Sequence, residues 1–271
     1  MSLDYWREVL GGVSIPFGHP RRGSLLVRER LVEGFLDGYV VPQGLIAHGR
    51  GECFDYLIGE VSIGPAVEAM RAGVALLLLS ERPVISVNGN VAALAAEHVV
   101  ELAREVDAVI EVNLFYRSRE RIERIRDVFK KLGVEVLGTD ERYECTIPEL
   151  FSERRKVDCR GIYVADTVLV AVEDGDRTEA LKKVGKKVIA IDLNPLSRTA
   201  LTADITIVDN IVRALPRMVQ IARELKKLER SELEKIVSSF DNRRNISLVL
   251  DHICSRLREI ASSLLMYKSE K

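Results

Sequence analysis

The chain has 271 residues, of which 47% are hydrophobic and 30% charged, and its formal net charge at pH 7 is -1. This length suits one large α/β domain or two small ones, and the hydrophobic share is enough to build a sizeable core. The near balance of acidic and basic residues argues against a general nucleic-acid-binding protein, which normally carries a basic excess.

The four cysteines, Cys53, Cys145, Cys159 and Cys254, are widely spaced. Their spacing suggests neither a zinc site nor a disulfide framework. The longest apolar run, residues 72–79, is far shorter than the roughly 20 residues that cross a bilayer. The N-terminus lacks the basic and then apolar pattern of a secretory signal. We therefore expect a cytoplasmic protein with no membrane partner and no metal ion held by its own side chains.

The segment before residue 63 does not share the alternating helix and strand pattern of the rest of the chain. Ser24 is in position to cap an amphipathic helix whose leucines and valines alternate with arginines and glutamates. Arg28 lies among these charged residues. A solvated helix face is therefore the default interpretation of Arg28.

Glycines stand on both sides of Arg50. Gly49 and Gly51 would let the backbone turn sharply or come close to a ligand. Because an exposed ion pair rarely needs glycine on both sides, Arg50 is a stronger site candidate than Arg28. The neighbouring His48 and Glu52 resemble part of an acid–base or metal site, but the four histidines of the chain are not paired at ligand spacing.

Helical and strand-like patterns alternate from about residue 63 onward. They predict helices over about 65–78, 89–105, 118–132 and 177–184, and strands over about 83–87, 108–112, 167–172, 188–191 and 205–208. Two amphipathic helices, about 211–228 and 244–265, follow with a shorter one between them. Such alternation indicates βαβ units, a mainly parallel sheet and helices on both faces, which is a Rossmann-like doubly wound α/β fold.

We expect residues 1–271 to form a single α/β domain in three parts. These are an N-terminal helical and loop region (1–62) that contributes to the site, a Rossmann-like core (63–210) and the C-terminal helices (211–271). Residues 140–161 have no clean period and are expected to form a loop or an insertion. The apolar stripes of the C-terminal helices either cover the sheet or form a subunit contact.

Polar residues follow several predicted strands at the edge where parallel sheets bind their ligands. They are Asn88-Gly89-Asn90, Asn113, Glu173-Asp174, Asp192-Leu193-Asn194 and Asp209-Asn210. Turn formation alone favours Asn, Asp and Gly at these positions, and Asn210 can simply be the N-cap of the next helix. Arg198 and Thr199, however, add groups that a turn does not require.

The residues around Asp192 suit a nucleotide. Asp192 and Asn194 can recognise a ribose or an adenine edge through hydrogen bonds, and the forked guanidinium of Arg198 can bind phosphate oxygens. Ser197 and Thr199 open a short helix whose N–H groups favour an anion. The chain has neither a P-loop nor a G-x-G-x-x-G fingerprint after a strand, which disfavours a hydride-transfer dehydrogenase.

Three stretches together resemble the archaeal phosphopantothenate synthetase (4-phosphopantoate–β-alanine ligase) family: GSLLVRER (23–30), GLIAHGRGE (44–52) and DLNPLSRTA (192–200). The resemblance runs over nearly the whole chain from about Ile15. It implies a homodimer that joins 4-phosphopantoate to β-alanine in coenzyme A biosynthesis, with ATP cleaved to AMP and diphosphate. By the same resemblance the ATP contacts fall on Arg28, Arg50, Asp192, Leu193, Asn194, Arg198, Thr199, Asn210 and Ile211.

In such a reaction the phosphopantoate carboxylate would attack the α-phosphate of ATP, and the amine of β-alanine would then attack the acyl-adenylate. Arg28, Arg50 and Arg198, with Mg²⁺ bridging the phosphates, would offset the repulsion between the anionic substrates. His48 and Glu52 are the candidates for the base that deprotonates the amine. The candidates for the phosphate subsite are Asn88, Gly89 and Asn90 at a helix N-terminus, or Arg117, just past Asn113.

Two further functions stay open from the sequence. One is another ATP-dependent carboxylate–amine ligase or a kinase, which would differ in its nucleotide products. The other is a non-catalytic nucleotide-sensing protein whose C-terminal helices bind a partner, and which would bind ATP without turnover.

Overall fold

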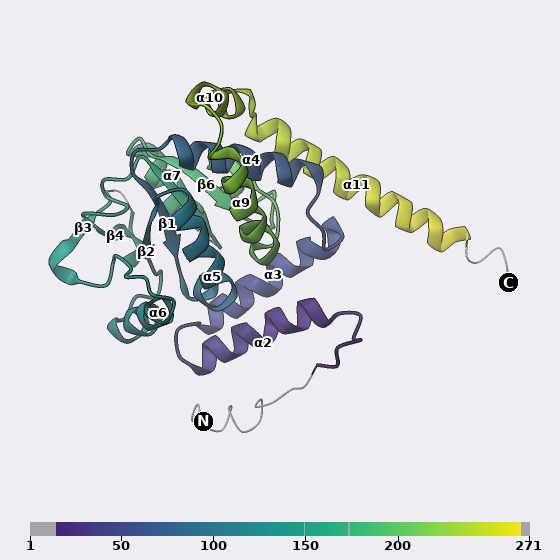
Figure 1. Ribbon diagram of the computed structural model, residues 1–271. Coiled ribbons are helices and arrows are strands. Elements are labelled where there is room, and N and C mark those ends of the chain that lie inside the picture. The colour runs from purple at the N-terminus through teal and green to yellow at the C-terminus, as the bar shows by residue number, and fades with distance from the viewer. Residues whose placement is uncertain (1–14, 149, 173, 267–271) are drawn as a thin grey trace.

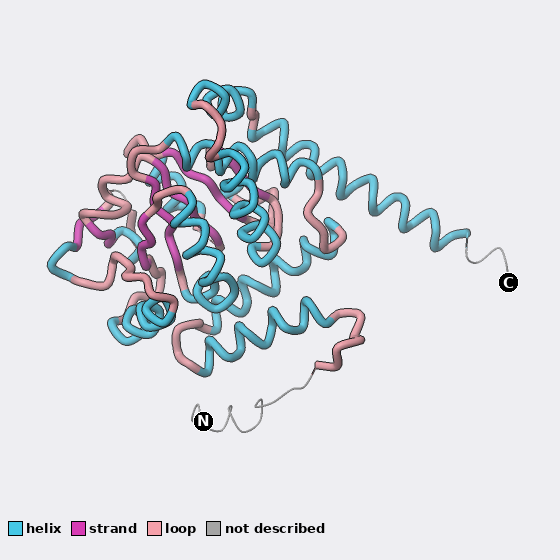
Figure 2. The backbone as a smooth tube through the Cα atoms, viewed as in Figure 1, coloured by secondary structure: helices cyan, strands magenta, loops and turns pink. Residues whose placement is uncertain are grey.

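Five parallel strands form the central sheet of the computed structural model, which describes residues 15–148, 150–172 and 174–266. The strands are β1 (Pro83–Val87), β2 (Val109–Val112), β5 (Thr167–Ala171), β6 (Lys187–Ile191) and β7 (Ile205–Ile207). Their order across the sheet is β2-β1-β5-β6-β7, and every neighbouring pair is parallel. The predicted mainly parallel sheet is confirmed, and Figure 2 shows its strands among the surrounding helices.

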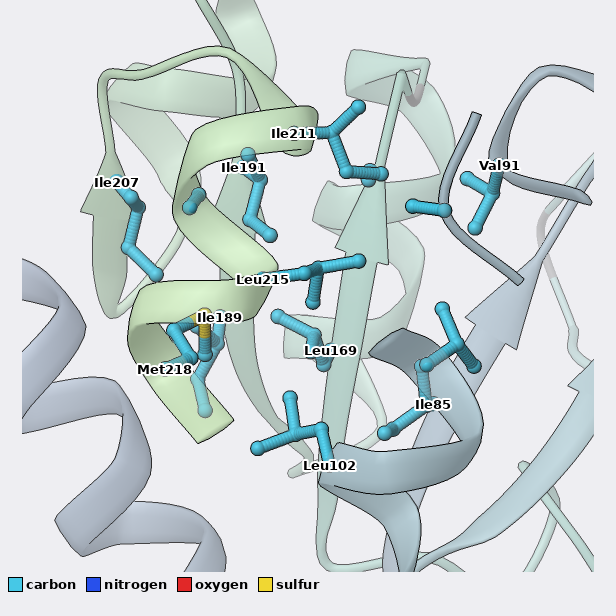
Figure 3. Packing of buried hydrophobic residues seen from close by; sticks show 14 of the residues in the cluster. Ile85, Val91, Leu102, Leu169, Ile189, Ile191, Ile207, Ile211, Leu215 and Met218 are labelled. Atoms are coloured by element: carbon cyan, nitrogen blue, oxygen red, sulfur yellow. The ribbon is translucent and has the colours of Figure 1, made fainter. Parts of the chain in front are cut away.

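Both faces of the sheet are apolar, and each packs against helices. Ile85, Leu169 and Ile189 point to one face and share a core with the helices there (Figure 3), whereas Val84 and Val168 point to the other face. The first face carries α4 (Gly64–Leu79), α5 (Gly89–Glu105), α6 (Arg119–Lys131) and α9 (Ile211–Leu225), and the second carries α7 (Gly175–Lys183), with α8 (Arg198–Thr202) beside it. The strands are continuously apolar because both faces are covered, and the expected doubly wound α/β fold is confirmed.

The strand order changes direction between β1 and β5. The chain runs from β1 outward to the edge strand β2, and then returns past β1 to build β5, β6 and β7 on the other side. In sheets of this kind the crevice outside the carboxyl ends of the strands at such a switch point is the usual ligand site.

Two helices precede the sheet, α2 (Arg22–Leu36) and α3 (Pro42–Ile58), and they lie along one end of the molecule (Figure 1). The expectation that Ser24 caps the first helix is wrong. The helix begins earlier, at Arg22, and the Ser24 hydroxyl instead donates a hydrogen bond to the Arg21 carbonyl within the first turn.

The suggested turn at Gly49-Arg50-Gly51 is also not formed, because these residues lie inside α3. Pro42 at the first turn and the left-handed Gly59 (φ 105°) fix the two ends of this helix and leave the internal glycines helical. The close approach that glycine permits occurs at Gly44, where a side chain would collide with Asn90.

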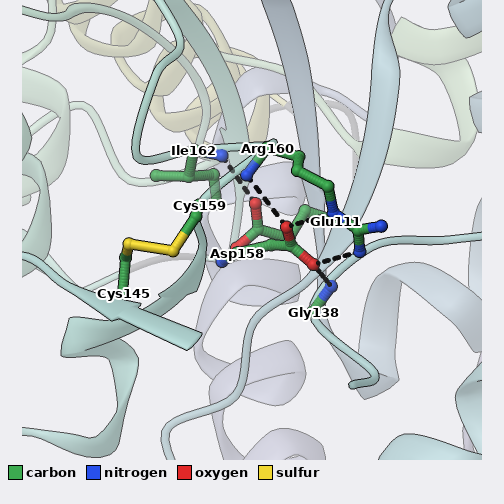
Figure 4. The surroundings of a disulfide bond; sticks show 7 residues. All are labelled: Glu111, Gly138, Cys145, Asp158, Cys159, Arg160 and Ile162. Carbon is green, nitrogen blue, oxygen red and sulfur yellow. Dashed lines mark hydrogen bonds and ion pairs between the residues drawn. A yellow bond between two sulfur atoms is a disulfide. The ribbon is translucent and has the colours of Figure 1, made fainter. Parts of the chain in front are cut away.

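The described residues between 140 and 161 form a small two-stranded arm beside the sheet. Strands β3 (Glu144–Thr146) and β4 (Lys156–Asp158) pair antiparallel, and the short helices η1 (Glu141–Tyr143) and η2 (Glu153–Arg155) precede them. The expectation of no disulfide is wrong, since Cys145 and Cys159 are bonded with their Cα atoms 5.1 Å apart (Figure 4). Their 14-residue separation in sequence gives no hint of this pairing, which the antiparallel register creates.

The described chain ends in α10 (Arg230–Ser239) and α11 (Asn242–Met266). The first half of α11 packs on α3 and α4 through residues such as Ile246, Val249 and Ile253, and its second half extends away from the body (Figure 1). Among the described residues, the helices all lack the length and apolar character needed to cross a bilayer.

Candidate functional site

Helix α3 lies over the carboxyl ends of the strands and presents polar side chains on two of its faces. Gly44 contacts Asn90 at the end of β1, where the Asn90 amide donates to the Gly44 carbonyl at 2.8 Å. Gly51 lies against Leu193 at the end of β6. Arg50 lines the same cavity as Gly44 and Asn90, whereas His48 and Glu52 line a different one.

A cavity of about 260 Å³ lies at the switch point of the sheet, and we call it the switch-point cavity. Its polar lining comes mainly from α3, from the segments after β1 and β5, from α6 and from the arm, and it includes Arg50, Asn88, Asn90, Arg121, Arg154 and Asp174. The predicted Asn88-Gly89-Asn90 turn and Arg50 are thus brought together, although they are far apart in sequence.

Asn88 links the two strands at the switch point. Its amide nitrogen donates to the carbonyls of Ala171 (2.9 Å) and Val172 (3.3 Å), while its side-chain oxygen caps α5 at Val91 N. Gly89 is required for a different reason, since a side chain there would collide with the Tyr39 carbonyl. The start of α5 therefore lines the cavity with Gly89, which has no side chain to protrude.

Two arginines at the switch-point cavity were not foreseen from the sequence. Arg121, on α6, donates to the Tyr39 carbonyl at 2.9 Å and also to the Tyr116 carbonyl. Burial and the nearby charge of Arg154 lower the pKa of Arg121. Arg154 is buried and lies 2.8 Å from a carboxylate oxygen of Asp174. In the sequence both arginines lie in charged stretches that resemble ordinary surface.

Asn113 does not line the cavity but holds the backbone of the arm, which carries Arg154, in place. Its side chain is fully buried, and its amide nitrogen donates to the carbonyls of Arg154 (3.1 Å) and Lys156 (2.9 Å). Arg117 was also a candidate for the phosphate subsite. It donates to the Gly138 carbonyl at 3.3 Å and lines a separate groove beside the arm. The structure therefore does not bring Arg117 together with the Asn88–Asn90 turn, and Glu173 lies outside the described residues.

Asp192 begins the loop after β6 as the sequence suggested. Its carboxylate accepts hydrogen bonds from Asn194 N (2.9 Å) and from the Ser197 hydroxyl (2.5 Å). Burial raises the pKa of Asp192, and the positive charge of Arg50 opposes that rise. Ser197 also caps α8 by accepting from Ala200 N, so the predicted short helix is confirmed.

The remaining residues of this loop point in different directions. Arg198 is 62% exposed and forms ion pairs with Asp176 (2.5 Å) and Glu179 (2.9 Å) of α7. Thr199 is buried in α8, and the side chain of Leu193 packs against the core. Arg198 thus lies beside the Asp192 segment, with its guanidinium held by carboxylates.

A second cavity, of about 360 Å³, lies on the other side of α3, and we call it the α9 cavity. His48, Glu52, Asp55, Asn210 and Arg213 contribute to its lining. Burial lowers the pKa of His48 below its usual value, which keeps the imidazole neutral near pH 7. Glu52 accepts from Arg28 Nη2 at 2.8 Å, so the two predicted residues meet as an ion pair.

Asn210 caps a helix and also lines the α9 cavity. Its side-chain oxygen caps α9 at Val212 N, and its amide nitrogen donates to Asp55 at 3.0 Å. Arg213 lies between the carboxylates of Asp55 (2.5 Å) and Asp209 (2.6 Å), a network that the sequence did not indicate. The side chain of the neighbouring Ile211 points into the hydrophobic core (Figure 3), which leaves its backbone as the part that can meet a ligand.

The residues that the structure describes contain no group of three or more histidine, cysteine, aspartate or glutamate side chains that could hold a metal ion.

Comparison with known proteins gives consistent matches over most of the chain. Residues 65–256 match the model of a family described as phosphopantothenate/pantothenate synthetase. The chain is 55% identical over 260 residues to a 4-phosphopantoate–β-alanine ligase of Thermococcus kodakarensis, which covers 95% of this chain and 99% of that protein. A protein of the same name from Thermococcus onnurineus is 54% identical with the same coverage. One from Methanosarcina mazei is 52% identical over 92% of this chain and 97% of its own length.

Proposed function

The chain belongs to the phosphopantothenate/pantothenate synthetase family, and from this premise we propose that it is the ligase that joins 4-phosphopantoate to β-alanine in coenzyme A biosynthesis. The resemblance to this family is confirmed. One structural observation carries the proposal: α3 brings Arg50 to the switch-point cavity and also close enough to Asp192 to affect its pKa. One guanidinium thus adjoins two candidate anion sites.

ATP is proposed to lie along the segment that begins at Asp192. The residues proposed to contact it are Arg28, Arg50, Asp192, Leu193, Asn194, Arg198, Thr199, Asn210 and Ile211. The position of the segment just after β6, at the ligand-binding edge of the sheet, supports this proposal. On binding, Arg198 would exchange its exposed carboxylate partners for phosphate oxygens. Mg²⁺ is proposed to enter as the ATP complex, coordinated mainly by phosphate oxygens and water.

The proposed chemistry begins with attack of a phosphopantoate carboxylate oxygen on the α-phosphorus of ATP. The new P–O bond forms the acyl-adenylate, and the bond to diphosphate breaks. The amine of β-alanine then attacks the acyl carbon, and AMP leaves with the electrons of the C–O bond. Arg50 is well placed to stabilise charge on the α-phosphate because it adjoins both the nucleotide segment and the cavity.

His48 is proposed as the base that accepts the proton from the β-alanine amine. A base must be unprotonated before the reaction, and burial favours the neutral form of this imidazole. Glu52 is proposed to assist by orienting His48 and Arg28, since it is paired with Arg28 and lies one helical turn from His48.

The switch-point cavity is proposed to receive 4-phosphopantoate. Asn88, Gly89 and Asn90 at the start of α5 supply N–H groups and a helix N-terminus, both of which favour an anion. Asn113 supports the cavity through the backbone of Arg154 and Lys156. Arg117 would take part only if the acid extended into the neighbouring groove.

A homodimer is proposed through the second half of α11. Leu257, Ile260 and Leu264 recur at helical spacing and are 44%, 39% and 66% exposed, which leaves an apolar stripe in contact with solvent. Light scattering is expected to give twice the chain mass of 30.4 kDa, and Leu264→Glu is expected to return the monomer. A wild-type monomer would contradict this part of the proposal.

The function is tested by incubating the protein with ATP, Mg²⁺, 4-phosphopantoate and β-alanine, with each component omitted in turn. AMP, diphosphate and 4'-phosphopantothenate should form only in the complete mixture. ADP and phosphate would instead indicate an acyl-phosphate route in a different ligase. ATP binding without any turnover would contradict the ligase proposal and favour a sensor.

A further inference from the structure

The described residues that line the switch-point cavity carry an excess of positive charge. Three of them are arginines, Arg50, Arg121 and Arg154, and one is an acid, Asp174. Three positive charges against one negative charge leave two in excess. A phosphate monoester carries a charge of about -2 at neutral pH, so one such group would balance the cavity.

Arg121 lacks a carboxylate partner within ion-pair distance in the described part of the chain. The carbonyls of Tyr39 and Tyr116 hold its guanidinium in place, but these dipoles do not cancel its charge. Burial, and then the like charge of Arg154, lower the pKa of Arg121. Holding two like charges together is costly unless an anion joins them.

Arg154 is brought to the same place by the two-stranded arm. Asn113 holds the arm through the carbonyls on both sides of Arg155, at Arg154 and Lys156. The Oδ1 atom of Asn113 is buried and has no hydrogen-bond partner among the described residues. The arrangement fixes the position of the Arg154 backbone at the expense of one unsatisfied polar atom.

Further contacts fasten the far end of the arm to the sheet (Figure 4). The Cys145–Cys159 disulfide closes the arm, and Glu111 on β2 accepts hydrogen bonds from Asp158 N (2.9 Å) and Ile162 N (2.6 Å). Asp158 in turn accepts from Gly138 N at 3.2 Å. The arm is therefore attached on both sides of Cys159, which limits how far Arg154 can move.

We propose that Arg121 and Arg154 together bind the phosphate group of 4-phosphopantoate and so select the phosphorylated acid over pantoate. This inference rests on the proposed function and assigns the phosphate to a definite end of the switch-point cavity. Two guanidinium groups can surround one phosphate with forked hydrogen bonds, while the carboxylate of the same molecule extends toward Arg50.

The test compares Arg121→Gln with Arg119→Gln, a matched control on the same helix whose side chain is 87% exposed and paired with Glu123. Equilibrium titrations with 4-phosphopantoate, pantoate and ATP give the three affinities of each variant. Arg121→Gln is expected to weaken phosphopantoate binding by roughly tenfold to a hundredfold, which is the usual worth of a hydrogen bond to a charged group. Its affinities for pantoate and ATP should equal those of the control.

Arg121→Lys should recover part of the affinity, because it keeps the charge and loses the fork. Equal losses for phosphopantoate and pantoate, or a loss confined to ATP, would overturn the assignment. Unaltered phosphopantoate affinity in Arg121→Gln would also overturn it. If the wild-type protein forms AMP from phosphopantoate and one of these contradicting results appears, the assignment of the phosphate to Arg121 and Arg154 fails, but the proposed function stands. If wild-type protein forms no AMP, the proposed function fails, and the titrations still decide whether Arg121 recognises a phosphate.

Discussion

The arginines that line the two cavities on either side of α3 differ in their ion pairing. In the α9 cavity, Arg28 is paired with Glu52, and Arg213 lies between two aspartates. In the switch-point cavity, Arg154 is paired with Asp174, whereas Arg50 and Arg121 have no carboxylate within ion-pair distance among the described residues. The contrast indicates that the Arg213 network stabilises the fold, whereas Arg50 and Arg121 are available to anions from solution.

The largest effect on stability is expected at Arg213. Arg213→Gln leaves the buried carboxylates of Asp55 and Asp209 without their cation, which typically lowers the free energy of unfolding by about 3 kcal/mol or more. Urea unfolding measures the loss. Arg223→Gln on the same helix is the matched control, and its loss should be much smaller because the Arg223 ion pairs are exposed. Similar losses in both variants would remove the distinction between the cavities.

Replacement of Arg50 should impair activity and leave stability nearly unchanged. Arg50→Gln is expected to reduce kcat roughly a hundredfold, the usual effect of losing one preorganised contact to developing charge. Its free energy of unfolding should change by no more than about 0.5 kcal/mol, since the side chain is exposed. Product assays and urea unfolding on the same preparation, with the exposed Arg71→Gln as control, give both numbers. An Arg50 variant that is unstable and yet fully active would refute the comparison.

Glu111 tests whether the arm is held by a neutral acid. Burial raises the pKa of Glu111 to about 7, above the 4.5 of an unperturbed glutamate, so the folded protein binds the proton more tightly than the unfolded chain. Its stabilisation is therefore complete at low pH and is lost as the pH rises through 7, by at most about 3 kcal/mol. Urea unfolding at pH 5 and pH 8 should show this fall, and Glu111→Gln should remove it. The exposed Glu135→Gln should keep the wild-type slope.

The smallest effect is expected at Arg198, whose ion pairs with α7 are exposed. Arg198→Gln should raise the KM for ATP by about tenfold or less, which corresponds to one charged hydrogen bond. Glu179→Gln should have the reverse effect, because it frees the guanidinium for phosphate. If Glu179→Gln also weakened ATP binding, Arg198 would not be a phosphate contact.

The sheet was predictable from the sequence because its signals are local. The apolar run at residues 83–87 and the helix that follows Asn88 are each specified within about 20 residues, and both appear in the structure as expected. Helix α3 was missed for the same reason. Gly49 and Gly51 indicate a turn locally, and only the packing of Gly44 on Asn90 and of Gly51 on Leu193 explains a helix there.

The candidate site was predictable only in part. The residues at the strand ends, such as Asn88 and Asp192, follow from the topology of parallel sheets. Arg121 and Arg154 could not be found in this way, because each is one of many arginines in a charged stretch. Their selection depends on tertiary contacts: the Tyr39 carbonyl for Arg121, and the arm for Arg154. The Cys145–Cys159 bond escaped prediction because it depends on the register of the arm.

A crystal structure of the protein with 4-phosphopantoate and a non-reactive ATP analogue tests most directly the claim that Arg50 and Arg121 receive the anionic substrates. We predict that the triphosphate lies along the Asp192 segment with its α-phosphate near Arg50. The phosphate of the acid should lie between Arg121 and Arg154. Density for both ligands in the α9 cavity, or a switch-point cavity filled only by water at saturating ligand, would contradict the account.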